Sequence, residues 1–412
     1  MKILIISYNW PPMNTIGTYR PLSWALVWAN MGHSITVLTS DKISTDGPLD
    51  LKIDLKNIRV ISVRNNSLLK TFSPGFIRIL KQFRLRFPGL LLFGQPRNMW
   101  YKKSEDFIKN STFDFDMMIS TSGPIASHLI ASSIKVKNPK IFWICDYRDL
   151  WSQLTVLKVS YIEKYLARIF EQRVVKNSEM ITCVSHGMSK KLGKLHKKYV
   201  YVSFNGFEGS VNTSDLSFNK KVFSNYIIYT GSFIDGYHDI SLIVFALRQF
   251  NLKYNKRVIL KVYGTKVHGI KKFIEENNIE EVVEFLGYHP KEDIEKSQRN
   301  ADFCLLLSNS RSTSDGDISG KFFEYLKSLR PIICTNAVKF GELDQLLKLT
   351  GCGINIDSIK EIVKILEEFY LDFKYPKFYK PNIDYINSFS RSEQASQLIN
   401  KAIEIKDGAS VL

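Results

Sequence analysis

Two successive series of short apolar runs, each alternating with helix-like stretches, are the strongest constraint on the fold of this chain. One series precedes Asn205 and Gly206, and the other follows them. Such alternation is typical of parallel sheets whose strands are joined by crossover helices. A chain of 412 residues also exceeds what one hydrophobic core comfortably holds. The pattern therefore predicts two Rossmann-like, doubly wound α/β domains facing each other across a cleft.

The predicted elements are given by residue range. In the first series the strands are 2–7, 34–39, 59–63, 117–120, 140–144, 180–184 and 199–202, and the helices are 19–31, 76–87, 125–134 and 161–177. In the second series the strands are 226–230, 258–263, 282–286, 303–307, 332–335 and 353–356, and the helices are 238–252, 269–277, 290–301, 319–329 and 359–369. The candidate motifs follow the ends of these strands, where open α/β sheets bind ligands.

Positive charge is concentrated in one part of the sequence. The formal charge is +17, which indicates an anionic partner unless the chain is simply basic throughout. Residues 55–104 contain no acid, and basic residues are interleaved there with bulky apolar ones. Such a mixture, densest over 72–93, is typical of a segment at an anionic membrane surface. A buried amphipathic helix with a solvated basic face is an equally good interpretation.

Other features of the composition exclude whole classes of protein. No run reaches the roughly 18–20 apolar residues of a transmembrane helix. The N-terminal MKILIISYNWPP is too short, and too soon interrupted by proline, for a signal peptide. Five scattered cysteines without a CxxC or His/Cys cluster indicate neither a disulfide framework nor a zinc site. We therefore expect a cytoplasmic protein, peripheral on the inner face of the cell membrane if the basic segment docks there.

The segment 319–331, SGKFFEYLKSLRP, gathers several chemical groups at one predicted helix N-terminus. Ser319 and Gly320 are typical of a helix start, and Lys321 and Glu324 lie three residues apart, on one face of the first turn. A cation, a carboxylate and free backbone N–H groups at this place suit a phosphate-bearing ligand. A core helix with a solvated charged face explains the same spacing.

Two further motifs follow predicted strands of the first series. Gly17 lets the backbone approach a ligand closely, and Thr18 can cap the next helix, although a plain strand-to-helix turn explains both residues. His128 follows the strand 117–120, and a lone histidine is more often structural than catalytic. The glycine pattern GxGxxG is absent, which argues against a nicotinamide or flavin enzyme.

Asp146, Arg148 and Asp149 follow the apolar strand 140–144. Two carboxylates flanking an arginine, beside aromatic rings, can orient sugar hydroxyls through charge-assisted hydrogen bonds. An internal ion pair that caps the next helix is the alternative interpretation.

Taken together, these segments resemble family 4 glycosyltransferases, which transfer sugars from nucleotide donors. Segment 319–331 is similar to the GK-[ILF]-[FY]-EYL-x3-[KR]-P signature of the family, and the N-terminal PP, YRP and GHSITVLT match its opening pattern. The segment DYRDLW at 146–151 resembles the D-x-RD-x-W box of a polysaccharide-synthesis branch. The resemblance runs in order from Ile3 to about Ile403.

The resemblance implies the GT-B fold, with an acceptor-binding domain over 1–205 and a nucleotide-sugar-binding domain over 206–384. A helix over 385–412 is expected to cross back to the first domain. The implied activity is a retaining, metal-independent sugar transfer without a cofactor, to a glycan or lipid-linked acceptor in cell-surface polysaccharide biosynthesis. Such a reaction depends on stabilising the departing diphosphate and positioning the acceptor hydroxyl.

The resemblance also assigns roles to single residues. Glu324 is expected to bind the donor ribose and Lys321 the diphosphate, while Asp146 stands where many members have a histidine near the transferred sugar. These three form the expected catalytic group. The other residues expected to bind the donor are Gly17, Thr18, Gly231, Tyr288, Asp317, Ser319 and Gly320, and those expected to bind acceptor or sugar are His128, Arg148 and Asp149.

At two places the chain departs from the family pattern. Gly316 stands where the Glu-x7-Glu motif has its first glutamate, so Asp315 or Asp317 would have to replace that carboxylate. The Arg and Lys that commonly follow the glycine at Gly231 are absent. The diphosphate charge is therefore left to Lys321, to loop amides or to another basic group.

Other functions stay open at the level of sequence. A nucleotide-sugar 2-epimerase shares the fold class, and a non-catalytic anion-binding protein would explain the charge. A nicotinamide-dependent oxidoreductase is disfavoured by the missing glycine pattern, and nucleic-acid binding by the lack of a recognisable module. The expected partners are a nucleotide sugar, a glycan or lipid-linked acceptor, and an anionic membrane surface contacted through residues 55–104, with no nucleic acid.

Overall fold

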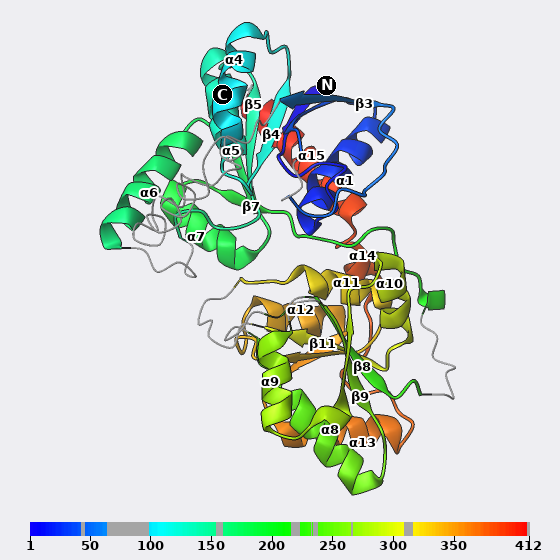
Figure 1. The fold of residues 1–412 in the computed structure, drawn as a ribbon. Coiled ribbons are helices and arrows are strands. Elements are labelled where there is room, and N and C mark those ends of the chain that lie inside the picture. Colours follow the sequence, from blue (N-terminus) through cyan, green and yellow to red (C-terminus); the bar gives the residue numbers. More distant parts are fainter. Residues whose placement is uncertain are drawn as a thin grey trace. The chain divides into compact units, whose positions relative to one another are not determined.

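A computed structural model (Figure 1) describes residues 1–412 except 43–45, 64–98, 154–159, 216–222, 232, 234–237, 265–266, 309–315 and 410–412. The chain forms two compact units, which are described separately. Unit 1 consists of Met1–Phe204 and Arg391–Leu412, and unit 2 of Asn205–Ser390. Each unit has its own parallel sheet and its own hydrophobic core.

Unit 1 is built on a seven-stranded sheet in the order β3-β2-β1-β4-β5-β6-β7. All neighbouring strands are parallel. The strands are β1 (Lys2–Ile6), β2 (Ser34–Ser40), β3 (Ile58–Val63), β4 (Met117–Thr121), β5 (Phe142–Tyr147), β6 (Met180–Cys183) and β7 (Val200–Val202). Because the strand order reverses its direction between β1 and β4, the topological switch point lies between these two strands.

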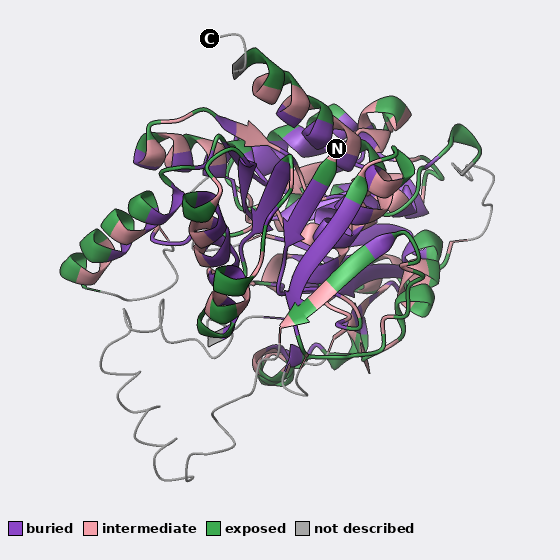
Figure 2. Cartoon of the chain, turned by 90° about the horizontal axis from the view of Figure 1, so that it is seen from above, coloured by how far each residue is buried: buried purple, intermediate pink, exposed green. Residues whose placement is uncertain are grey.

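Helices cover both faces of this sheet. Successive side chains of β1 point to opposite faces. Leu4 and Ile6 join the core shared with α4–α7, and Ile3 and Ile5 join the core shared with α1 and α15. Figure 2 shows the resulting buried strands in purple, with exposed green residues on the edge strand β3. The helices are α1 (Ile16–Asn30), α4 (Met99–Asn110), α5 (Ala126–Lys137), α6 (Tyr161–Val175), α7 (His186–His196) and α15 (Arg391–Ala409).

Unit 2 repeats the same plan with a six-stranded parallel sheet in the order β10-β9-β8-β11-β12-β13. Its switch point lies between β8 and β11. The strands are β8 (Tyr226–Thr230), β9 (Ile259–Tyr263), β10 (Val283–Gly287), β11 (Phe303–Leu307), β12 (Ile332–Thr335) and β13 (Gly353–Ile356). The helices are α8 (Ser241–Tyr254), α9 (His268–Glu276), α10 (Lys291–Asn300), α11 (Gly320–Ser328), α12 (Glu342–Thr350), α13 (Ile359–Tyr370) and α14 (Ile383–Asn387).

Every strand predicted from the sequence is confirmed to within a few residues, and so are the predicted helices that fall on described residues. The predicted helix 76–87 and the basic, apolar stretch 72–93 lie outside the described residues. Of the helices that the structure describes, α4, α7 and α12 were not predicted. Among the described residues, no helix is both long and apolar enough to cross a membrane.

Two predicted helix ends are wrong. Helix α1 begins at Ile16, after Thr15, so Thr18 is a fully buried residue inside the helix and not its cap. The expected helix 385–412 is divided at Ser388–Ser390 into α14, which belongs to unit 2, and α15, which belongs to unit 1.

Candidate functional site

The candidate residues gather at the carboxyl ends of strands in both units. In unit 1 they lie on β5, in the loop after β5, and in the first turns of α1 and α5, the helices that follow β1 and β4. In unit 2 the main group follows β8 and β11. Both groups border the switch point of their own sheet, which is where open α/β sheets bind ligands.

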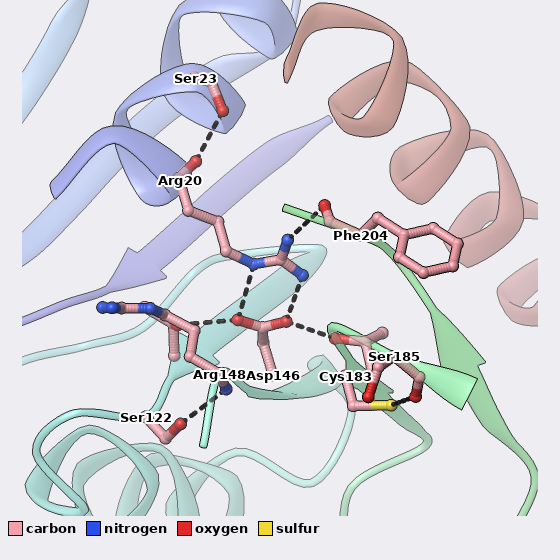
Figure 3. A network of polar contacts seen from close by, with 10 residues as sticks. Arg20, Ser23, Ser122, Asp146, Arg148, Cys183, Ser185 and Phe204 are labelled. Atoms are coloured by element: carbon pink, nitrogen blue, oxygen red, sulfur yellow. Dashed lines mark hydrogen bonds and ion pairs between the residues drawn. The ribbon is translucent and has the colours of Figure 1, made fainter. Parts of the chain in front are cut away.

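Asp146 is fully buried and lies inside β5. The sequence had placed it in the loop after this strand. Its Oδ1 atom accepts hydrogen bonds from Arg20 Nη2 at 2.7 Å and from Thr182 Oγ1 at 2.8 Å. Its Oδ2 atom accepts from Arg20 Nε at 3.2 Å and from Thr121 Oγ1 at 2.8 Å. Arg20 also donates to the carbonyl oxygen of Phe204 (Figure 3). The carboxylate therefore ties β5 to β4, β6 and α1.

This pairing keeps Asp146 ionised. Burial by itself would raise the pKa of the carboxyl, because it penalises the charged form. The Arg20 guanidinium and the hydrogen bonds from Arg20, Thr121 and Thr182 outweigh burial, so the pKa lies below its ordinary value. At neutral pH Asp146 has no proton to donate. The internal ion pair considered as an alternative is thus present, but its cation is Arg20 and not Arg148.

Three loops of unit 1 meet beside this ion pair. Asn9 Nδ2 donates to the carbonyl oxygen of Gly123 at 2.9 Å, and Arg148 Nη1 donates to that of Gly17 at 3.3 Å. A Cβ atom on Gly17 would lie 2.5 Å from Arg148 Nη1 and 2.6 Å from Asn9 Nδ2, so any larger residue would displace these two side chains. The Arg148 backbone N–H donates to Ser122 Oγ (Figure 3). Gly17 therefore lets Arg148 and Asn9 approach the first turn of α1 closely.

The other predicted residues of unit 1 divide between surface and core. Asp149 is exposed and Arg148 half-buried, so both have surface to offer a ligand. Thr18 and His128 are fully buried and have none. The His128 Nδ1 atom lies 2.8 Å from Ser120 Oγ, and burial lowers the pKa of the ring to about 4. The structural interpretation of this lone histidine fits its position better than direct sugar contact does.

Lys321 occupies the first turn of α11. The Ser319 hydroxyl caps this helix by accepting a hydrogen bond from the Lys321 backbone N–H. The Lys321 Nζ atom donates to the Tyr229 hydroxyl at 2.6 Å and lies 4.4 Å from the centroid of the Tyr229 ring. Gly231, with a φ of 114°, passes close by: a Cβ atom there would lie 2.5 Å from Lys321 Cε. The Lys321 side chain is thus held by the hydroxyl and the ring face of Tyr229. It occupies the space where a side chain at position 231 would lie.

Burial is the main influence on the protonation of Lys321 and of His238. It lowers the pKa of Lys321 to about 8, although the charge of Glu324 opposes the shift. Burial also lowers the pKa of His238 to about 4, and there the charge of Lys321 adds to the shift while Asp317 opposes it. At pH 7 the lysine is therefore mostly charged and the histidine neutral. A partly buried cation at a helix N-terminus is suited to binding an anion.

The remaining donor candidates lie at different places in unit 2. Gly320 begins α11, and Glu324 lies half-buried one turn further along it. Asp317 is exposed just before the helix, and Asp315 falls outside the described residues. Tyr288 is 70% exposed and follows β10, which β9 separates from β8. The structure therefore groups the residues around the α11 N-terminus and places Tyr288 apart from them.

Several residues of these arrangements were not predicted as site residues, among them Arg20, Asn9 and Tyr229. Arg20 precedes Asp146 by 126 residues, and Tyr229 precedes Lys321 by 92 residues, so no local spacing connects the partners. The YRP motif marks Arg20 as part of a family pattern without indicating what it binds. Within the described parts of the chain, no cluster of three or more His, Cys, Asp or Glu side chains could hold a metal ion.

Solved structures with a similar fold extend over essentially the whole chain. Sucrose-phosphate synthase from Thermosynechococcus elongatus matches with a TM-score of 0.63 and 12% identity, covering 99% of each chain. A glycosyltransferase from Rickettsia africae matches with a TM-score of 0.60 and 12% identity, covering 98% of each. The chain has the GT-B fold. Anabaena HepE in complex with UDP-glucose, at a TM-score of 0.56 and 12% identity, covers 100% of each chain.

This GT-B chain has no match among protein-family models or curated protein sequences. At identities this low, the structural likeness establishes the fold, and the chemistry has to be argued from the residues of the site.

Proposed function

We propose that this protein is a glycosyltransferase that binds a nucleotide-sugar donor at the N-terminus of α11 in unit 2. The observation that carries the proposal is Lys321, a partly buried cation at a helix N-terminus, beside the open turn at Gly231. This combination at a topological switch point suits the diphosphate of a sugar nucleotide. HepE, a protein of similar fold, has been solved with UDP and with UDP-glucose, which supports the same class of donor here.

In this proposal the donor site acts through preorganised charge. Lys321 neutralises the diphosphate, and the free N–H groups near Ser319 and Gly320 add hydrogen bonds to its oxygens. Charge develops on the diphosphate as the sugar departs, so a cation already held in place lowers the barrier of that step. Glu324, on the same face of α11, binds the ribose hydroxyls. These roles make Lys321 the main basic group for the diphosphate, since the usual Arg and Lys after Gly231 are absent.

Unit 1 is proposed to bind the acceptor. Arg148 and Asp149 are the charged residues with surface at the carboxyl end of β5, and they are placed to orient acceptor hydroxyls. Asp146, buried beneath them, is a positioning residue that holds β5 against its neighbours. Retention of configuration, independence of metal ions, and a glycan or lipid-linked acceptor of polysaccharide biosynthesis are included in the proposal on the strength of the sequence resemblance.

A thermal-shift panel of nucleotide sugars tests the donor assignment. A ligand at a hundred times its dissociation constant stabilises the folded state by about 2.7 kcal/mol, which is readily seen as a rise in Tm. We expect Lys321→Met and Glu324→Ala to reduce this rise strongly. Lys327→Met is the matched control, because Lys327 lies on the same helix but donates to Glu295.

The proposal fails if no nucleotide sugar raises the Tm of the wild-type protein. Product analysis with the stabilising nucleotide sugar then separates two reactions of the same fold class. A transferase releases nucleoside diphosphate and extends an acceptor, whereas a 2-epimerase converts the sugar nucleotide without any acceptor.

A further inference from the structure

Helix α6 of unit 1 exposes a continuous apolar stripe. The residues recur at helical spacing and are 37–93% exposed: Tyr161, Ile162, Tyr165, Leu166 and Ile169. The opposite side of the helix is buried against the unit through Ala167, Glu171, Val174 and Val175. A helix that already packs inward through one face has no structural need of a second apolar face. Exposed apolar residues gathered in this way mark an interaction surface.

The stripe begins on a well-defined first turn. Ser160 accepts a hydrogen bond from the Glu163 backbone N–H at 3.2 Å, and the Glu163 carboxylate accepts one from the Ser160 backbone N–H at 2.9 Å. This capping box fixes the turn that carries Tyr161 and Ile162. The apolar residues are therefore presented by a formed helix rather than by a frayed end.

Exposed basic residues lie on α6 and on α7, the helix that packs beside it (Figure 1). The exposed ones between 160 and 198 are Arg168, Arg173, Lys176, Lys190, Lys194 and Lys197. Glu179 is the exposed acid of that span, and it is already paired with Lys135. The other two acids are engaged as well, Glu163 in the capping box and Glu171 in the core. The charge of this surface is thus complementary to an anionic partner.

We propose that α6 docks the protein on an anionic lipid surface, with the stripe at the boundary between headgroups and acyl chains. An apolar stripe flanked by Lys and Arg is the pattern of a helix that lies in a membrane interface. Tyr161 and Tyr165 suit that depth, since each has an apolar ring and a polar hydroxyl. The inference is independent of the donor assignment, and it uses residues other than the basic segment 55–104.

Vesicle binding by the full chain tests this docking. Sedimentation with vesicles of phosphatidylcholine, with and without phosphatidylglycerol, measures partitioning of wild type and of a variant with Tyr161→Ser, Ile162→Ser, Tyr165→Ser and Leu166→Ser. We expect binding to the phosphatidylglycerol vesicles that weakens with salt, and a loss of about tenfold or more in the variant. The four positions are exposed, so thermal unfolding of the variant should match that of wild type.

A matched control removes exposed apolar residues elsewhere. Leu252 and Leu349 are exposed residues of unit 2, on α8 and α12, and the double variant Leu252→Ser/Leu349→Ser should bind vesicles as wild type does. Equal binding by the α6 variant would assign attachment to another segment and overturn the proposal. The proposal is also overturned if the wild-type protein does not bind the vesicles. It is overturned as well if the wild type forms a dimer that the α6 variant abolishes, because the stripe would then be a contact between copies of the chain.

Discussion

At the scale of single residues, the surroundings of Lys321 connect its protonation to ligand binding. Tyr229 supplies a hydroxyl and a ring face, and burial raises the pKa of that hydroxyl, so Tyr229 is neutral at physiological pH. Burial of Lys321 itself brings its pKa to about 8. A bound diphosphate adds negative charge beside the ammonium and raises this pKa again. Above pH 8, donor binding is therefore expected to take up a proton.

Gly231 should be important for donor binding because it leaves space for the Lys321 side chain. In Gly231→Ala the new methyl group would meet Lys321 Cε, so we expect the lysine to be displaced and donor affinity to fall about tenfold or more. The positive φ adds a stability cost of about 1–2 kcal/mol. Gly209→Ala is the control, because Gly209 has a φ of 83° and nothing within 4 Å. Titration with the stabilising nucleotide sugar checks this, and equal affinity in the two variants would contradict it.

Asp146 should matter to stability. In Asp146→Asn the buried Arg20 loses its countercharge, and we expect a loss of about 3–5 kcal/mol in the free energy of unfolding at pH 7. The folded-state pKa of Asp146 is lowered, so its contribution is complete above the unfolded-state pKa of about 3.9 and declines as pH falls below it. Urea unfolding should therefore show the gap between wild type and variant narrowing below about pH 4. A gap that stays constant down to the acid limit would contradict this reasoning.

At the scale of elements, strands were predicted more completely than helices, for a physical reason. Strands buried on both faces are continuous apolar runs, such as Ile332–Thr335, that stand out from their neighbours. The helices that were not predicted lack a comparable signal. Helix α7, for example, contains Gly187 and Gly193 among several lysines. Such helices are stabilised mainly by tertiary packing, which cannot be recognised from a local sequence pattern.

For helix α11, the start of the helix could be predicted from the local sequence, but its contacts with other strands could not. Its start at Ser319 and Gly320 was predicted from the sequence and is confirmed. The contact between Lys321 and Tyr229 was not, because it depends on β8 lying next to β11 in the sheet. The sequence thus located the helix end that is proposed to bind the anion, but not the hydroxyl and the ring that hold its lysine.

Helix α15 is expected to be part of the structural core of unit 1. Leu398 is fully buried in the core shared with α1, and Trp28 Nε1 of α1 donates to the Ala395 carbonyl oxygen at 2.9 Å. Leu398→Ala should therefore cost about 2–5 kcal/mol. Asn400→Ala, at an exposed position of the same helix, is the control and should cost little. In calorimetry of Leu398→Ala, the Tm of unit 1 should fall and the Tm of unit 2 should stay the same. Unchanged Tm values for both units would contradict the assignment of α15 to the core of unit 1.

At the scale of the whole molecule, the two units divide the proposed task. The residues proposed to bind the donor at the N-terminus of α11 belong to unit 2, and the residues proposed to bind the acceptor belong to unit 1. The alternation of strands and helices predicted two doubly wound domains, and the comparisons with solved structures confirm the GT-B fold. The partners of Asp146 and Lys321 could not be predicted, since each pair joins segments that only the strand order brings together.

Equilibrium titration of the full chain with a nucleotide sugar tests the central claim most directly. Wild type should bind at pH 7 at least about tenfold more tightly than Lys321→Met, since the lysine supplies the countercharge for the diphosphate. With a Lys321 pKa of about 8, wild-type affinity should fall by about tenfold between pH 7 and pH 9, while the variant stays nearly constant. Equal affinities of wild type and Lys321→Met at pH 7 would contradict the account.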